Sequence, residues 1–78
     1  MSKFEFTEET LKLGDVVLHR IKATVDFSYV RKGGLGGFIE KEENLSQEGN
    51  AWVYGNAWVY GDAEVSGDAR VYGDDRVY

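Results

Sequence analysis

The chain has 78 residues with 9 Lys and Arg, 14 Asp and Glu, one His, 10 Gly, and neither Pro nor Cys. A domain of this length buries only about 60% of the surface that its unfolded chain exposes, so small domains add disulfides, a metal or partner subunits. The absence of Cys excludes disulfides, and with a single His it excludes most zinc sites. We therefore expect no metal and no cofactor, and we predict a homo-oligomer, with a trimer favoured and a dimer next.

The net charge of −5 argues against a nucleic acid polymer as partner, because such binding depends on clustered Lys and Arg. Residues 1–36 hold 6 basic and 5 acidic groups, whereas residues 37–78 hold 3 basic and 9 acidic groups. No apolar run is long enough to span a membrane, and the start MSKFEFTEET lacks an apolar signal region. We therefore expect a cytoplasmic protein without a membrane partner.

Residues 1–34 are predicted to form a short β-rich cap. Leu11 and Leu13 lead into a turn at Gly14-Asp15, and an alternating strand follows from Val16 to Val25. His19 lies on the more apolar face of that strand, where a single His is more often a packed residue than a general base. With no Cys and no Ser-His-Asp spacing, we expect no catalytic residue and no enzyme activity.

Five residues, Gly33-Gly34-Leu35-Gly36-Gly37, form a glycine-rich segment that follows Arg31-Lys32. The segment lacks the Gly-Lys-Ser/Thr ending of a phosphate-binding loop, and no helix is predicted after it. We interpret it as a tight passage from the cap into the repeat, in preference to a phosphate site.

From residue 49 to residue 78 the chain consists of five hexads, GNAWVY, GNAWVY, GDAEVS, GDARVY and GDDRVY. A period of six does not match a helix of 3.6 residues per turn, but it suits short strands whose side chains alternate between two faces. Ala and Val of each hexad point to one side, the residue between them points to the other, and Gly with Asn or Asp makes a corner. Three hexads close an 18-residue coil, so residues 18 apart should stack as parallel strands.

Two partial hexads can be aligned upstream of the repeat. They place Asn44 at a corner, Leu45 at the small inward position and Gln47 at the Val position, with the first coil beginning at Gly37-Phe38-Ile39. Residues 35–78 are therefore predicted to form a hexapeptide-repeat β-helix that folds as one unit with the cap.

The hexads resemble those of the hexapeptide-repeat left-handed β-helix. More closely, LHRIKA (18–23), LGGFIEKEENLS (35–46) and the GNAWVYGNAWVYGDA stretch are similar to phage and enterobacterial proteins that are commonly labelled transferases on repeat similarity alone. The resemblance implies an all-β fold, in which the β-rich cap is followed by a truncated left-handed parallel β-helix of about two coils. Members of this family usually continue for many more hexads.

The outward positions of the coils supply the candidate site. Trp, Tyr and Arg are the residue types enriched in interface hot spots, and two of the three predicted faces hold them in columns. The candidate ligand-binding or interface residues are Trp52, Tyr54, Trp58, Tyr60, Arg70, Tyr72, Arg76 and Tyr78. Candidate anion contacts are Arg20, Lys22, Arg31 and Lys32.

Aromatic rings and Arg suit a flat anionic molecule such as a nucleotide. Together with the phage resemblance, they predict a non-catalytic, oligomeric binding protein that sequesters a nucleotide-derived signal of host defence at its subunit interfaces, in the host cytoplasm. One alternative is a structural or protein-binding module whose acidic face docks on a host protein. The other is a remnant of an acyltransferase.

Overall fold

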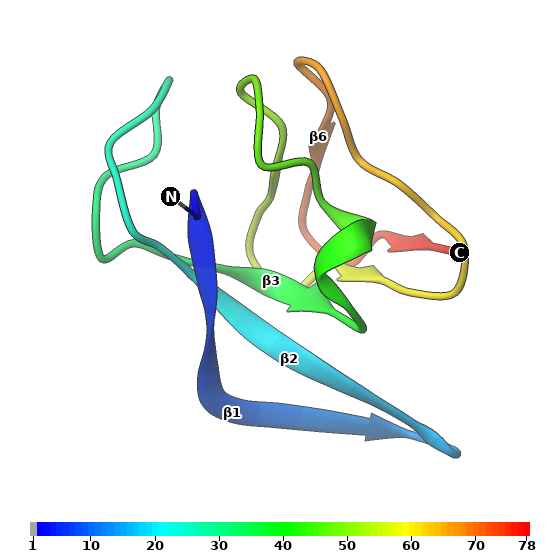
Figure 1. The fold of residues 1–78 in the computed structure, drawn as a ribbon. Helices are drawn as coiled ribbons and strands as arrows, with labels where there is room; N and C mark the ends of the chain where they lie inside the picture. Colours follow the sequence, from blue (N-terminus) through cyan, green and yellow to red (C-terminus); the bar gives the residue numbers. More distant parts are fainter. Residues whose placement is uncertain (1) are drawn as a thin grey trace.

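The computed structural model describes residues 2–78 and begins with an antiparallel hairpin. Strand β1 (Phe4–Leu13) pairs with β2 (Val16–Ala23). The predicted turn joins them, with Gly14 at a φ of 60°, a left-handed conformation that favours glycine. The hairpin lies along the lower side of the molecule in Figure 1 and extends beyond the repeat.

The hexads form parallel strand pairs with the predicted offset of 18 residues. Strand β4 (Trp52–Val53) pairs with β6 (Arg70–Val71), and β5 (Trp58–Val59) pairs with β7 (Arg76–Val77). Between the strands the glycines of the hexads adopt φ values from 59° to 75°, which turn the chain at each corner. The stacking of residues 18 apart is thus confirmed.

The layer that precedes the hexads pairs with them at a separation of 20 residues instead of 18. Strand β3 (Leu35–Ile39) pairs in parallel with β5, placing Phe38 beside Trp58, and Leu45 forms a parallel bridge with Val65. The predicted start of this layer at Gly37-Phe38-Ile39 agrees with that pairing, but the predicted upstream hexads were wrong by two residues. Leu45 occupies the position equivalent to Val, because the segment between Leu45 and Ala51 is two residues longer than a hexad allows.

Asn44 holds this irregular corner together. It ends a short 3-10 helix, η1 (Glu42–Asn44), and its side chain is fully buried. Its Oδ1 accepts hydrogen bonds from the main-chain N–H groups of Glu40 and Lys41, while its Nδ2 donates to the carbonyls of Gly61 and Ala63. All of these polar atoms are therefore paired inside the protein, as buried amides require.

The core lies inside the repeat and under the hairpin. Ala and Val of the hexads point inward, and Val53 and Val59 have no exposed surface. They pack with Phe4, Ile21 and Ile39 from the N-terminal strands, so both parts of the chain share one cluster. The predicted boundary between a cap (1–34) and a β-helix (35–78) stays a prediction.

Gly36 and Gly37 allow the passage from hairpin to repeat. A Cβ at Gly36 would lie 2.7 Å from Ile21 Cγ1, and one at Gly37 would lie 2.5 Å from the Ala57 carbonyl. The glycines are therefore needed for close approach of β3 to its neighbours, which agrees with the interpretation of this segment as a tight passage.

The five-stranded sheet has the order β1-β2-β3-β5-β7, and β4-β6 forms a second sheet. The predicted all-β class is confirmed, and the two sheets are not joined into a closed one. Within residues 2–78 there is no helix of the length and apolar character needed to cross a membrane.

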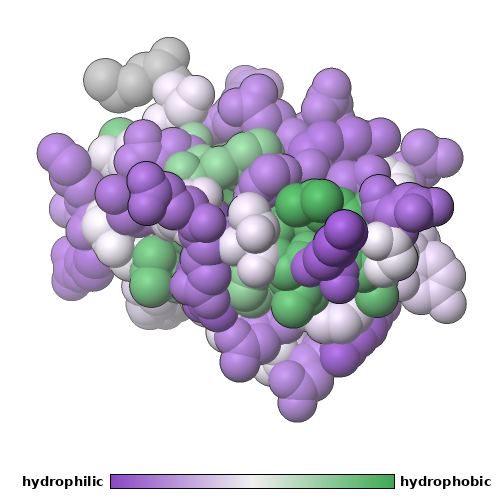
Figure 2. Space-filling model, turned by 90° about the horizontal axis from the view of Figure 1, so that it is seen from below, coloured by the Kyte–Doolittle hydropathy of each residue, from purple (hydrophilic) through white to green (hydrophobic). Residues whose placement is uncertain are grey.

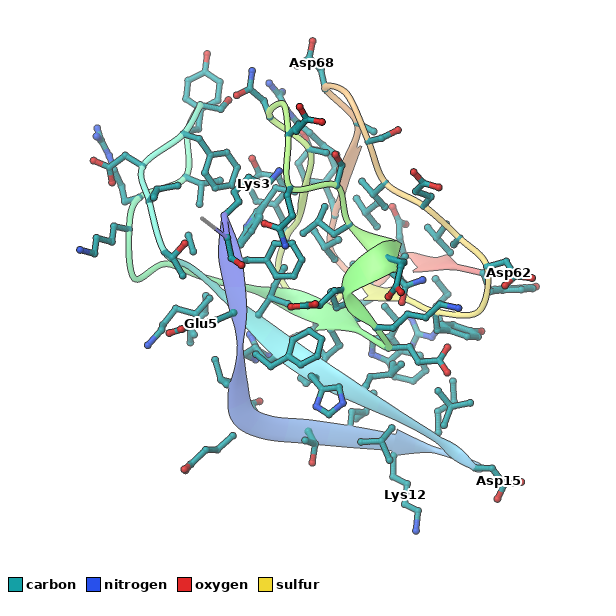
Figure 3. The ribbon with its side chains drawn as sticks, in the orientation of Figure 1. Lys3, Glu5, Lys12, Asp15, Asp62 and Asp68 are labelled. Carbon is teal, nitrogen blue, oxygen red and sulfur yellow. The ribbon has the colours of Figure 1, made fainter. Side chains whose placement is uncertain are left out.

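Lys3 anchors the N-terminal segment to the repeat. Its side chain points into the molecule (Figure 3), where Nζ donates to the carbonyl of Ala51 at 2.8 Å and lies 4.7 Å from the ring centroid of Phe27. Burial of the ammonium group lowers the pKa of Lys3 below its ordinary value of 10.5.

We predict a pH dependence of stability from this group. Because the folded-state pKa of Lys3 lies below the unfolded one, its protonated form costs stability at low pH, and the cost disappears as pH rises toward 10.5. The free energy of unfolding of the natural protein should therefore rise, relative to that of Lys3→Met, as pH increases over this range. Urea unfolding at a series of pH values measures it, and a constant difference between the two proteins would contradict the prediction.

Candidate functional site

Two columns of stacked tyrosines run along the outside of the repeat. The rings of Tyr54 and Tyr72 lie 5.3 Å apart at 20°, and those of Tyr60 and Tyr78 lie 5.3 Å apart at 22°. The hexad register produces both stacks, since the members of each pair are 18 residues apart. Tyr72 is 52% exposed and Tyr78 is 80% exposed, so the upper ring of each column is open to solvent.

A third column combines aromatic rings with arginines on the outer face of the larger sheet. The Arg76 guanidinium lies 3.9 Å from the ring centroid of Trp58, and that of Arg20 lies 4.5 Å from the centroid of Phe38. Phe38 and Trp58 are neighbours in the parallel pairing of β3 and β5. Cation–π contacts of this kind contribute about 0.5–1 kcal/mol when exposed.

Trp52 departs from the expected arrangement. We expected its indole on an outer face beneath Arg70, and the two residues are indeed register partners. However, the side chain is only 1% exposed, because Phe4 and Phe27 pack edge-on against its ring at centroid distances of 6.5 and 5.3 Å. Trp52 therefore belongs to the core and does not offer a surface to a ligand.

Tyr29 takes the place that Trp52 leaves. It lies in the turn between the bridged residues Phe27 and Val30, is 83% exposed, and has Arg70 5.6 Å from its ring centroid. Hydrogen bonding to Tyr72 raises the pKa of the exposed Arg70 guanidinium. Sequence reasoning missed Tyr29 because only the docking of the cap on the repeat brings it to Arg70, and no local pattern marks that contact.

The four candidate anion contacts have different surroundings. Arg20 makes several contacts within the chain. Its Nη1 donates to the Gly36 carbonyl, its Nη2 donates to Asn56 Oδ1 at 2.8 Å, and its Nε lies 3.1 Å from Glu9 Oε1. Two nitrogens of Arg20 already donate hydrogen bonds within the fold, whereas its buried Nε makes none despite its short distance to Glu9.

The other three candidate cations are more exposed. Lys22 forms an exposed ion pair with Glu5. Arg31 and Lys32 are exposed on the cap. The role of all four toward an anion stays a prediction.

His19 is half-buried on β2, where its ring stacks on that of Phe6 at a centroid distance of 4.6 Å. It lies opposite Thr10 of β1 and Ile39 of β3. The stacked tyrosines belong to the repeat, and none of them comes from these three strands.

Seen from the hairpin side, apolar side chains form small patches separated by hydrophilic ones (Figure 2). Within residues 2–78 no three His, Asp or Glu side chains are grouped in a way that could hold a metal ion.

Two shallow hollows of similar size lie on the surface of residues 2–78. One, of about 480 Å³, is formed by cap residues that include Thr24 and Lys32. The other, of about 500 Å³, lies beside η1 and the Leu45–Val65 bridge and is rimmed by carboxylates. Its lining consists of Glu42, Glu43, Leu45, Ser46, Gln47 and Glu64.

No family model matches the chain. A protein of Escherichia coli (strain K12) with the name uncharacterized acetyltransferase YdcK is 43% identical to it over 51 residues, which make up 65% of this chain. The chain spans 15% of the length of that curated relative. The relative is named a transferase, which agrees in part with the resemblance of the hexads to proteins labelled transferases. The match covers only a short part of the relative.

The different positions of the two tryptophans can be measured by fluorescence. Trp52→Phe leaves only the half-exposed Trp58, whereas Trp58→Phe leaves only the buried Trp52. We expect acrylamide to quench the first variant several-fold more strongly than the second. Equal quenching of the two variants, with both shown to be folded by circular dichroism, would contradict the burial of Trp52.

Proposed function

We propose that the protein is a non-catalytic, homo-oligomeric binding protein built on a short left-handed parallel β-helix. The 18-residue register, the glycine corners and the inward Ala and Val positions support this architecture. The trimer is the favoured assembly and the dimer the next.

One observation favours binding above other functions. The side chains of Trp58, Tyr60, Arg76 and Tyr78 form adjacent columns on the outside of the repeat, where their stacking supports neighbouring layers and still leaves Arg76 and Tyr78 open to solvent. Large exposed rings beside Arg are typical of interface centres and of sites that stack planar ligands. The same residues can therefore contact a second subunit, a ligand held between subunits, or both.

The ligand class follows from the chemistry of these side chains. Tyr and Trp rings stack on planar bases, and an Arg guanidinium binds phosphate through paired hydrogen bonds. In its most specific form, the proposal is that a phage-encoded protein sequesters a nucleotide-derived defence signal in the host cytoplasm. The phage element of the proposal rests on the resemblance of the hexads and of the residues before them.

A second candidate function is acyl transfer, or descent from an acyltransferase. The name of the Escherichia coli relative favours it, because that protein is called an acetyltransferase. Against it, the single imidazole stacks on Phe6 in the cap hairpin, and within residues 2–78 it makes no hydrogen bond or ion pair of the kind that activates a nucleophile. We therefore rank binding first.

The binding proposal predicts that the protein retains a small anionic molecule. Native mass spectrometry of protein purified from phage-infected, signal-producing cells should show an oligomer with bound nucleotide-sized mass. Trp58→Ala and Arg76→Ala should each reduce this retained mass at least about tenfold, because each removes one partner of the exposed stack.

Lys12→Ala serves as the matched control, since Lys12 is an exposed cation on β1, far from the repeat in Figure 3. A monomer without retained mass would contradict the proposal. Sustained release of coenzyme A from acetyl-coenzyme A, retained in Lys12→Ala, would support the transferase alternative in its place.

A further inference from the structure

Tyr29, Arg70 and Tyr72 are exposed and, with the half-buried Tyr54 beneath Tyr72, form a continuous cluster, which we call the tyrosine–arginine surface. Arg70 lies over the Tyr29 ring on one side, and Tyr72 stacks on Tyr54 on the other. None of the ion pairs found within residues 2–78 includes Arg70. The surface therefore presents two exposed rings and one cation that pairs with no carboxylate of residues 2–78.

The second hollow described above, here called the acidic hollow, has the opposite character. Its floor includes the buried Leu45, and its rim holds the exposed carboxylates of Glu42, Glu43 and Glu64. None of these three carboxylates takes part in an ion pair within the described part of the chain. A hollow rimmed by carboxylates is complementary in charge to a guanidinium.

The two surfaces cannot meet within one molecule. Arg70 belongs to the β4–β6 pair, whereas Glu64 precedes Val65 in the separate bridge to Leu45, and the corner at Gly67 lies between them. A symmetric contact of two tyrosine–arginine surfaces would place two Arg70 guanidinium groups in one interface that holds no carboxylate of either surface, which like-charge repulsion disfavours. A contact between unlike surfaces on two copies avoids that repulsion.

We propose that subunits associate by a heterologous contact, in which the tyrosine–arginine surface of one copy docks on the acidic hollow of the next. The inference rests on the proposed self-association and specifies its interface. Each copy then keeps one surface of each kind available, so the contact closes into a ring or continues as an open chain. Interactions between Arg70 and the carboxylates make the association weaker at high salt.

The test uses two charge reversals and their mixture. Arg70→Glu and Glu64→Lys should each weaken self-association at least about tenfold, measured as the dissociation constant from sedimentation at a series of concentrations. Arg70→Glu keeps a natural acidic hollow, and Glu64→Lys keeps a natural tyrosine–arginine surface. An equal mixture should therefore form at least this natural contact, seen by native mass spectrometry as a dimer with one copy of each variant.

Lys12→Glu and Glu8→Lys are the controls, because both residues are exposed on β1 and lie outside the two surfaces. If the natural protein is monomeric, this inference and the proposed oligomer both fail. If it is oligomeric but the reversals behave like the controls, or the mixture forms no mixed dimer, the interface is wrong while the oligomer stands. Loss of retained ligand in Arg70→Glu with an unchanged subunit count would assign the surface to ligand binding and overturn the inference.

Discussion

The whole repeat depends on main-chain hydrogen bonds between residues that lie one layer apart. The N–H of Tyr54 donates to the Val71 carbonyl at 2.7 Å, and that of Tyr60 donates to the Val77 carbonyl at 2.9 Å. Strands of two residues make too few such bonds to be stable alone, and the inward Val side chains supply the burial that holds the layers in register. A shift of one residue would turn the Val side chains outward and bring charged neighbours such as Glu64 and Arg70 inward.

The same register builds the outer surfaces. Because each layer repeats the one below, aromatic residues at equivalent hexad positions become columns without any further interaction to align them. The cap then changes one face: it covers Trp52 and brings Tyr29 over Arg70. Some basic side chains of the cap make contacts within the protein, as Arg20 does when it donates to Gly36 and Asn56. The exposed cations that remain beside aromatic rings are those of the repeat.

Five hexads in register were enough to predict the parallel pairing, the tyrosine stacks and the contact of Arg76 with Trp58, since periodicity alone fixes them. The hairpin turn at Gly14 was also predictable, because its signal is local. The burial of Trp52, the contact of Tyr29 with Arg70 and the 20-residue first layer were not predictable. They depend on how a non-repeating cap packs against the repeat, and on a two-residue extension whose corner is held by the buried side chain of Asn44.

The 18-residue register can be tested most directly by engineered disulfides, since the natural chain has no Cys. Asn50 and Asp68 occupy equivalent exposed corners, with Asn50 Nδ2 3.3 Å from Asp68 Oδ1, and Cα atoms in adjacent parallel strands are close enough for a disulfide. Asn50→Cys with Asp68→Cys should form an intramolecular disulfide on mild oxidation, measured by mass spectrometry, while Asn50→Cys with Asp74→Cys should not. Equal or faster bridging in the second variant would contradict the register and the surfaces that depend on it.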